Sequence, residues 1–183
     1  MEQLLKINQL TIDQEKYEQI DHNVLWLAKI LEELQDHTDP EGDVSHPSET
    51  SFLEAKLKLL KKKSNALKDH LIIRGTVNTS YHTQCVRCLA PARETLKVDF
   101  SACFLHHSFK QQEEYHDITD IFCDGELMEL YFYNKNAVDL YEYIHEQIFL
   151  NVNQRPLHNT DCKGLCPICG FNLNLGKCIH ARK

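Results

Sequence analysis

The sequence predicts an α+β protein: an antiparallel sheet or a partly closed β-barrel, packed by one or two helices. Three observations support this prediction. Apolar and polar residues alternate over several segments between residues 53 and 104, which is typical of half-buried strands. Two other segments repeat apolar residues at helical spacing. The last segment, residues 156–183, is polar and rich in cysteine, so it cannot build an apolar core of its own.

The helical spacing predicts one amphipathic helix over residues 22–34, with Asp21 or His22 as its N-cap. Its apolar positions are Val24, Leu25, Leu27, Ala28, Ile30, Leu31 and Leu34. A second helix is predicted to begin after Asp139, whose side chain can accept hydrogen bonds from the first-turn amides. Each helix has one apolar face to bury against the sheet.

The period-two alternation predicts strands over residues 53–59, 70–85 and 96–104, with further strand candidates at 3–12 and 127–133. KKKSN at 61–65 is interpreted as a hairpin turn, in preference to a nucleic-acid contact. Residues 106–125 are rich in histidine and acidic side chains and are expected to form a loop.

Composition shifts along the chain suggest three parts. Residues 1–50 form an acidic N-terminal segment with one helix and a polar linker, residues 51–155 an α+β core, and residues 156–183 a C-terminal module. Residues 1–50 hold twelve Asp/Glu and three Lys, a balance of −9, so the rest of the chain carries +2 of the total of −7. No long-range field therefore draws the whole protein to nucleic acid, but a local basic patch near the C-terminus is expected.

Neither a membrane-spanning stretch nor a secretory signal is recognisable in the sequence, so a cytoplasmic location is expected. In a reducing compartment, eight cysteines indicate metal ligation or buried thiols more than a disulfide framework. Cys103 and Cys123 are isolated in the sequence and are interpreted as small buried residues.

The C-terminal cysteines have the spacing of a zinc site: Cys162-x3-Cys166-x2-Cys169-x8-Cys178. Zinc favours four tetrahedral ligands, and two cysteines separated by two residues can chelate one ion across a tight turn. Pro167 restricts that turn, and Gly170 can adopt the positive φ that turns backbone amides toward the sulfur atoms. Metal binding would have to stabilise so short a segment. We therefore predict a structural zinc held by Cys162, Cys166, Cys169 and Cys178, a zinc knuckle.

A second Cys-x-x-Cys, formed by Cys85 and Cys88, allows three interpretations. The pair could share a zinc with Cys166 and Cys169, act as a redox pair, or pack a turn as structural thiols. His158 and His180 flank the C-terminal cysteines, and either could replace one of them as a ligand.

Catalysis is not expected from these residues. Four thiolates would close the coordination sphere of zinc, whereas a catalytic zinc keeps an open position. No triad order, phosphate-binding loop or H-E-x-x-H motif is recognisable in the sequence, and no cofactor besides zinc is expected.

Three segments, in order, resemble the YceD family of large ribosomal RNA subunit accumulation proteins. They are CVRCL at 85–89, DLYEYIHEQIFLNV at 139–152 and DCKGLCPICGFNLN at 161–174. Residue by residue, the resemblance covers Cys85, Arg87, Cys88, Leu89, Asp139, Leu140, Glu146, Gln147, Cys162, Gly164, Cys166, Pro167, Cys169, Gly170, Asn172, Asn174 and Cys178. This chain departs from many relatives in having His158 and His180 in place of cysteine, and Asn153 in place of proline.

The resemblance implies a cytoplasmic bacterial factor linked to accumulation of 23S ribosomal RNA and to assembly of the large subunit. Family members have no established catalytic activity. Ribosomal RNA or pre-50S particles are the implied partners, with a protein partner as a further option and no membrane or small-molecule substrate. Some relatives keep the first cysteine pair and lack the C-terminal cysteines, which implies that the two groups need not share one metal. Two other functions stay open: a zinc-ribbon protein-interaction module in transcription or translation, and a thiol-disulfide oxidoreductase using Cys85 and Cys88.

Overall fold

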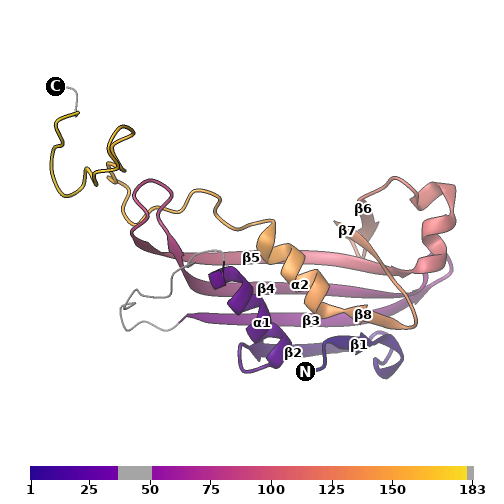
Figure 1. Cartoon of the computed structure of the whole chain (residues 1–183). Helices are drawn as coiled ribbons and strands as arrows, with labels where there is room; N and C mark the ends of the chain where they lie inside the picture. The colour runs from indigo at the N-terminus through magenta and orange to yellow at the C-terminus, as the bar shows by residue number, and fades with distance from the viewer. Residues whose placement is uncertain (37–50, 181–183) are drawn as a thin grey trace.

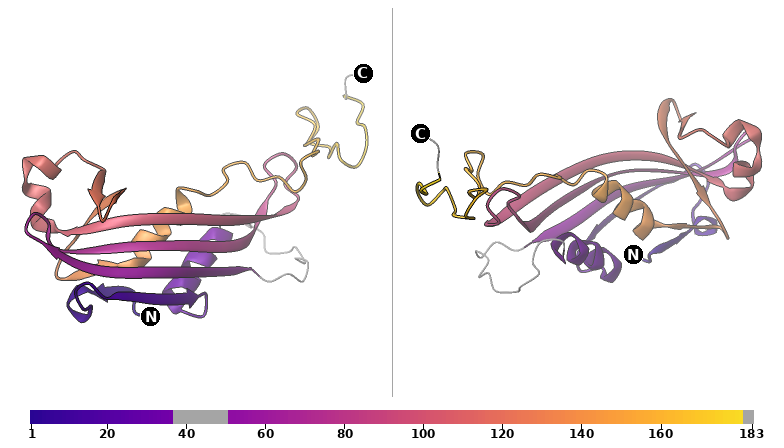
Figure 2. Two further views of the ribbon diagram at one scale, coloured as in Figure 1. Left: turned by 180° about the vertical axis from the view of Figure 1, so that it is seen from behind. Right: turned by 45° about the horizontal axis from the view of Figure 1, so that its top comes forward.

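The computed structural model describes residues 1–36 and 51–180, and two helices lie over one face of its long, curved sheet (Figures 1 and 2). The six-stranded sheet has the order β2-β3-β4-β5-β7-β6, and a separate two-stranded sheet joins β1 to β8. The elements are β1 (Leu4–Lys6), η1 (Ile7–Gln9), β2 (Glu15–Asp21), α1 (Leu25–Asp36), β3 (Phe52–Ser64), β4 (Lys68–Gln84), β5 (Pro91–His106), η2 (His107–Gln111), η3 (Glu113–Tyr115), β6 (Asp120–Cys123), β7 (Glu126–Tyr133), β8 (Ala137–Asp139) and α2 (Leu140–Phe149).

The predicted α+β class with two packed helices is confirmed, whereas the partly closed barrel is wrong because the sheet stays open between its edge strands β2 and β6. The sheet is also not wholly antiparallel. Strand β7 follows the η2–η3 excursion and the short β6, and it returns alongside β5 in the parallel direction. None of the helices in the described ranges is long and apolar enough to cross a membrane.

Helix α2 begins as the sequence predicts, because the Asp139 side chain accepts hydrogen bonds from the amides of Tyr141 and Glu142. Asp139 also accepts from the side chain of Gln3, which ties the first strand to this helix. Helix α1 overlaps the predicted segment at 22–34: it begins at Leu25 and continues past the predicted end to Asp36. The predicted linker at 35–50 lies almost entirely outside the described residues.

The turn predicted at 61–65 is wrong, because Lys61–Lys63 continue β3 and the hairpin to β4 closes after Ser64. These lysines face acidic side chains instead of a free surface: Lys61 and Lys63 pair with Asp69, and Lys62 pairs with Asp124. The expected loop at 106–125 contains η2, η3 and β6. Strands β2 and β8 were not predicted, because β2 is mostly exposed and lacks alternation and β8 has three residues.

The main core lies between the sheet and the two helices. Helices α1 and α2 contribute fully buried residues such as Leu27, Ile30 and Ile144, which pack with the inward side chains of β3, β4 and β5. Burying each such side chain contributes roughly 1.5–3 kcal/mol. The first 36 residues share this core, since β2 pairs with β3 and α1 packs on the sheet.

A second core lies at the η2–η3 end of the sheet and contains both isolated cysteines, which confirms that they are buried. A hydrogen bond with Cys103 and one with His70 lower the pKa of Cys123 to about 5, although burial opposes the shift. The same contact with Cys123, together with burial, raises the pKa of Cys103. The C-terminal segment lies beyond the opposite end of the sheet, next to the tip of the β4–β5 hairpin (Figures 1 and 2).

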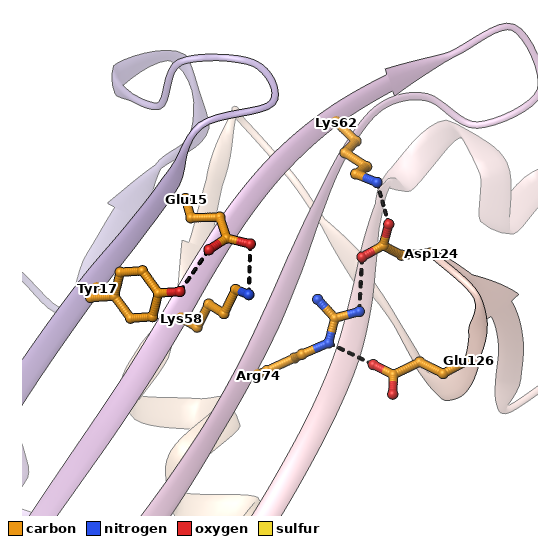
Figure 3. A network of polar contacts seen from close by, with 7 residues as sticks. All are labelled: Glu15, Tyr17, Lys58, Lys62, Arg74, Asp124 and Glu126. Atoms are coloured by element: carbon orange, nitrogen blue, oxygen red, sulfur yellow. Dashed lines mark hydrogen bonds and ion pairs between the residues drawn. The ribbon is translucent and has the colours of Figure 1, made fainter.

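Two separate groups of polar side chains lie over the sheet, one at its β2 end and one toward β7 (Figure 3). At one end, Glu15 accepts a hydrogen bond from Tyr17 and pairs with Lys58. At the other, Asp124 contacts Lys62 and Arg74, and Arg74 also reaches Glu126 at 2.6 Å. These contacts pair Lys58, Lys62 and Arg74 of β3 and β4 with carboxylates.

We predict that Gly75→Ala destabilises the sheet by roughly 1–3 kcal/mol through overpacking. A Cβ at residue 75 would lie 2.6 Å from the Phe100 ring and 2.7 Å from the Lys56 carbonyl oxygen. Chemical denaturation should show the loss. Gly176→Ala is the control, since its Cβ would meet its nearest neighbour, the Phe171 ring, at 4.0 Å. Equal stability of the two variants would contradict this packing.

We predict that Asp124→Asn lowers stability at pH 7 by on the order of 1 kcal/mol, and that the loss shrinks in acid. Hydrogen bonds from Lys62 and Arg74 lower the pKa of Asp124 below its ordinary value of 3.8. The stabilisation is therefore complete above that value and disappears as pH falls through the folded-state pKa. Urea denaturation at pH 7 and pH 3 tests this, with Asp117→Asn, whose side chain is 93% exposed, as the control.

Candidate metal centre

The β4–β5 hairpin carries the first cysteine pair at its tip. The Cys85 amide donates to the Ala90 carbonyl at 2.9 Å, and the Leu89 amide donates to the Cys85 carbonyl at 2.8 Å. Leu89 adopts a left-handed φ of 61°, which closes the turn. Both thiols are buried, at 0% exposure for Cys85 and 6% for Cys88.

The segment that follows α2 brings His158 and Cys162 to this turn. Its path is held by backbone contacts, because the Val86 amide donates to the Pro156 carbonyl at 3.0 Å. Nearer the cysteine, Arg87 Nη1 donates to the Cys162 carbonyl at 2.9 Å. These bonds place two residues far along the chain against the hairpin.

We call Cys85, Cys88, His158 and Cys162 the hairpin cluster. Their ligand atoms all lie within 4.8 Å of one another. The Cys85 and Cys162 sulfur atoms are 3.6 Å apart, and the Cys88 sulfur is 3.2 Å from His158 Nδ1. The three sulfurs are buried among a few apolar neighbours, while His158 is exposed.

The pKa values of the two hairpin thiols are shifted in opposite directions. Burial raises the pKa of Cys85, but hydrogen bonds from His158 and from the amides of Arg87 and Cys88 outweigh it and lower that pKa to about 5. Burial and the neighbouring thiols of Cys162 and Cys85 raise the pKa of Cys88 to about 11, against a hydrogen bond from the Ala90 amide. A thiolate at Cys85 is the form that binds metal.

We call Cys166, Cys169, Cys178 and His180 the knuckle cluster. Their ligand atoms also lie within 4.8 Å of one another. The turn has the predicted form: the Gly170 amide donates to the Cys166 carbonyl at 2.9 Å, and Gly170 has a φ of 70°. Amides of Cys169 and Ile168 hydrogen-bond the Cys166 thiol and lower its pKa to about 6.

The structure divides the four predicted zinc ligands between the two clusters. Cys166, Cys169 and Cys178 lie together with His180, whereas the sulfur of Cys162 lies with Cys85 and Cys88. The reason is the short connection after Cys162. The Leu165 amide donates to the Arg87 carbonyl at 3.0 Å, and Gly164 passes so close to Arg87 that a Cβ would lie 3.2 Å from its carbonyl oxygen. This contact separates Cys162 from Cys166.

The structure also bears on the alternatives that the sequence left open for Cys85, Cys88, His158 and His180. Cys85 and Cys88 lie with Cys162, and not in one group with Cys166 and Cys169. Both histidines named as replacement ligands occur in a cluster, His158 in one and His180 in the other. His158 and Cys162 are four residues apart in the sequence. This spacing is a signal that they can supply two ligands to one site, and the prediction from the sequence did not use it.

Three thiols and one imidazole form a donor set that suits zinc, and either cluster could hold a metal ion. Four protein ligands would leave no position for a substrate or an activated water, so the geometry favours a structural ion. Each cluster supplies two ligands from one tight turn and two from a second piece of chain. An ion in either cluster would therefore cross-link loops that have little core of their own.

We predict that a strong zinc chelator opens the knuckle and leaves the sheet folded, because the knuckle lacks a core while the sheet has two. Trypsin cleavage after the exposed Lys163 and Lys177 should accelerate on the order of tenfold. Circular dichroism should still show the sheet, and added zinc should restore protection. Unchanged cleavage after complete zinc removal would contradict a metal-supported knuckle.

Comparison with known proteins matches residues 73–183 to the model of one family, "Large ribosomal RNA subunit accumulation protein YceD". The matched region runs from β4 to the C-terminus and contains both clusters. No solved structure matches the chain.

Uncharacterised proteins of Mycobacterium bovis and of two strains of Mycobacterium tuberculosis are each 26% identical to the chain over 108 residues. The similarity covers 59% of this chain and 47% of each of those proteins. The chain thus spans about half the length of the curated relatives it matches. Because the family model covers more than half of the chain, this protein belongs to the YceD family of large ribosomal RNA subunit accumulation proteins.

Proposed function

We propose that this protein supports accumulation of 23S ribosomal RNA and assembly of the large ribosomal subunit without catalysing a reaction. Membership of the YceD family over residues 73–183 is the observation that carries the proposal. We place this role in the bacterial cytoplasm, where ribosomes are assembled. The partners we propose are ribosomal RNA or pre-50S particles.

The charge of the C-terminal region supports a contact with RNA. Arg155, Lys163 and Lys177 are exposed, and no acidic residue occurs between residues 162 and 180. By contrast, the lysines at 61–63 are paired with carboxylates, so they offer RNA a weaker surface. Arg182 and Lys183 extend the basic sequence but lie outside the described residues. Cations on a small rigid module are suited to phosphate contacts.

We propose that a structural zinc holds this module in shape, with Cys166, Cys169 and Cys178 as ligands. His180 is the fourth ligand that the geometry favours, in place of Cys162 of the set predicted from the sequence. The ion would fix the loops that present the cations, and it would not take part in chemistry. The knuckle then acts as a C-terminal unit attached to the α+β core.

A protein-interaction module is the second candidate, and one observation favours it. Ile168, Leu175 and Ile179 are exposed by 70%, 80% and 94%, which is unusual for large apolar side chains gathered within one short segment. The thiol-disulfide alternative gains less support. Cys85 has the lowered pKa that such an enzyme needs, but its sulfur is fully buried among other metal-binding groups.

The test is sedimentation of cell extracts from a strain that lacks the gene and carries a plasmid copy. We expect the wild-type protein to cofractionate with pre-50S particles, and its loss to lower 23S relative to 16S ribosomal RNA. Lys163→Glu/Lys177→Glu should abolish cofractionation, whereas Lys97→Glu, an exposed lysine on β5, should not. The proposal fails if the protein never cofractionates with these particles and 23S levels do not change on its loss. Capture of a protein partner without ribosomal RNA would favour the second candidate.

A further inference from the structure

We infer that the hairpin cluster is a second zinc centre, separate from the knuckle, so that one chain binds two zinc ions. Its ligands are Cys85, Cys88, His158 and Cys162. This inference is independent of the ribosomal role, because it concerns the ions that the isolated chain binds.

The dimensions of the hairpin cluster fit zinc. Zinc–sulfur bonds near 2.3 Å and zinc–nitrogen bonds near 2.0 Å place tetrahedral ligand atoms about 3.4–3.8 Å apart. The Cys85–Cys162 sulfur distance of 3.6 Å lies in this range, and the 3.2 Å between the Cys88 sulfur and His158 Nδ1 is slightly shorter. All four ligand atoms lie within 4.8 Å of one another. The side chains therefore enclose a space of the size of one ion.

The ligands also arrive as two short chelating pairs from distant parts of the chain. Cys85 and Cys88 share the hairpin turn, and His158 and Cys162 lie together after α2. The apolar neighbours at this junction are small in number: Ala90, Leu157 and Leu165 pack against the three sulfurs. Such limited burial is a weak substitute for a core, and an ion would supply the missing cross-link.

Groups around the sulfurs suit a negatively charged zinc site. Three thiolates and Zn²⁺ carry a net charge of −1. Asn174 Nδ2 donates toward the Cys162 sulfur at 3.6 Å, and the Arg87 guanidinium reaches the Cys162 carbonyl at 2.9 Å. Outer hydrogen-bond donors and a nearby cation of this kind orient and stabilise metal-bound thiolates.

A disulfide between Cys85 and Cys162 is the competing interpretation of their short distance. This disulfide would use only the Cys85 and Cys162 sulfurs and would leave the Cys88 thiol and the His158 imidazole facing only each other. One zinc ion would bind all four groups. The two possibilities also differ in mass and in metal content. They can therefore be separated on the intact protein.

The hairpin zinc would anchor the knuckle to the sheet. Cys162 is followed three residues later by Leu165, whose amide donates to Arg87 of the hairpin. Asn174 of the knuckle contacts both the Cys162 sulfur and the Lys163 amide, the latter at 2.8 Å. The hairpin ion would thus fix the start of the C-terminal segment at Cys162, and the knuckle ion would fix the loops between Cys166 and His180.

The first experiment measures zinc per chain in the full-length protein by elemental mass spectrometry. We expect two zinc ions in the wild type and one in each of two matched variants, Cys162→Ser and Cys178→Ser. Alkylation of Cys162→Ser should modify Cys85 and Cys88 and spare Cys166, Cys169 and Cys178. Exposure of the knuckle thiols in that variant, with Cys85 and Cys88 spared, would return Cys162 to the knuckle and overturn the inference.

The second experiment uses the unaltered chain, so it stands even where a variant fails to fold. Thiol alkylation is followed by peptide mass spectrometry during graded chelation, with the buried Cys103, whose pKa is raised, as an unreactive reference. We expect Cys166, Cys169 and Cys178 to become reactive together and first, because Cys169 is exposed. Cys85, Cys88 and Cys162 should follow together at higher chelator.

Three results would overturn the inference: one zinc per chain in the wild type, a mass lower by two hydrogen atoms that maps to a Cys85–Cys162 disulfide, or Cys162 becoming reactive with the knuckle thiols. None of these results depends on ribosomes. A protein that binds two ions and never meets pre-50S particles would refute the proposed function alone. A protein that cofractionates with the particles and binds one ion would refute the second centre alone.

Discussion

The antiparallel pairing of β4 with β5 is the constraint on which the rest of the structure depends. It runs without interruption from Leu71 opposite Phe104 to Gln84 opposite Pro91, and it carries the Cys85–Cys88 turn to one end of the molecule. The same two strands supply side chains to both cores. A change of register by one residue would exchange their two faces, and would therefore damage both cores and displace the Cys85–Cys88 turn together.

The two faces of the sheet are covered by different elements. One face is covered by α1 and α2, which bury a continuous set of leucine, isoleucine and aromatic side chains. The other face is covered at one end by η2, η3 and β6, and elsewhere it carries charged side chains that pair across strands (Figure 3). Mixed charge on an open sheet limits edge and face aggregation without creating a strongly basic surface. Near the C-terminus, where the fold is built of loops, Arg155, Lys163 and Lys177 are exposed.

Loops can present charge to RNA only if something holds their shape. The two Cys/His clusters could offer this support by holding metal ions at the junction between the hairpin and the C-terminal segment, and both lie in the region that the YceD family model matches. A closed set of four ligands is suited to rigidity and not to catalysis. The architecture thus joins a conventional α+β core to a small C-terminal segment whose Cys/His clusters could hold metal ions. The cysteine and histidine side chains of both clusters are therefore concentrated at one end of the long sheet.

The sequence by itself determined the class of the fold, because helical and strand periodicities are local properties of neighbouring residues. The α2 cap at Asp139, the strands around Leu57 and Val98, the burial of Cys103 and Cys123, and the positive φ of Gly170 were all predictable for that reason. Elements that are stabilised by contacts with distant segments were missed. Strand β2 is mostly exposed and polar, so its sequence lacks a strand pattern. Lys61–Lys63 continue a strand because acidic side chains on neighbouring elements form ion pairs with them.

The grouping of the candidate metal ligands was likewise decided only by tertiary structure. Spacing in the sequence placed Cys162 with Cys166, since they are four residues apart. The contacts of Leu165 and Gly164 with Arg87 direct the Cys162 sulfur to the hairpin instead, next to cysteines more than seventy residues away. Sequence spacing shows which residues can chelate as a pair, but the packing of distant segments decides which pairs meet around one point.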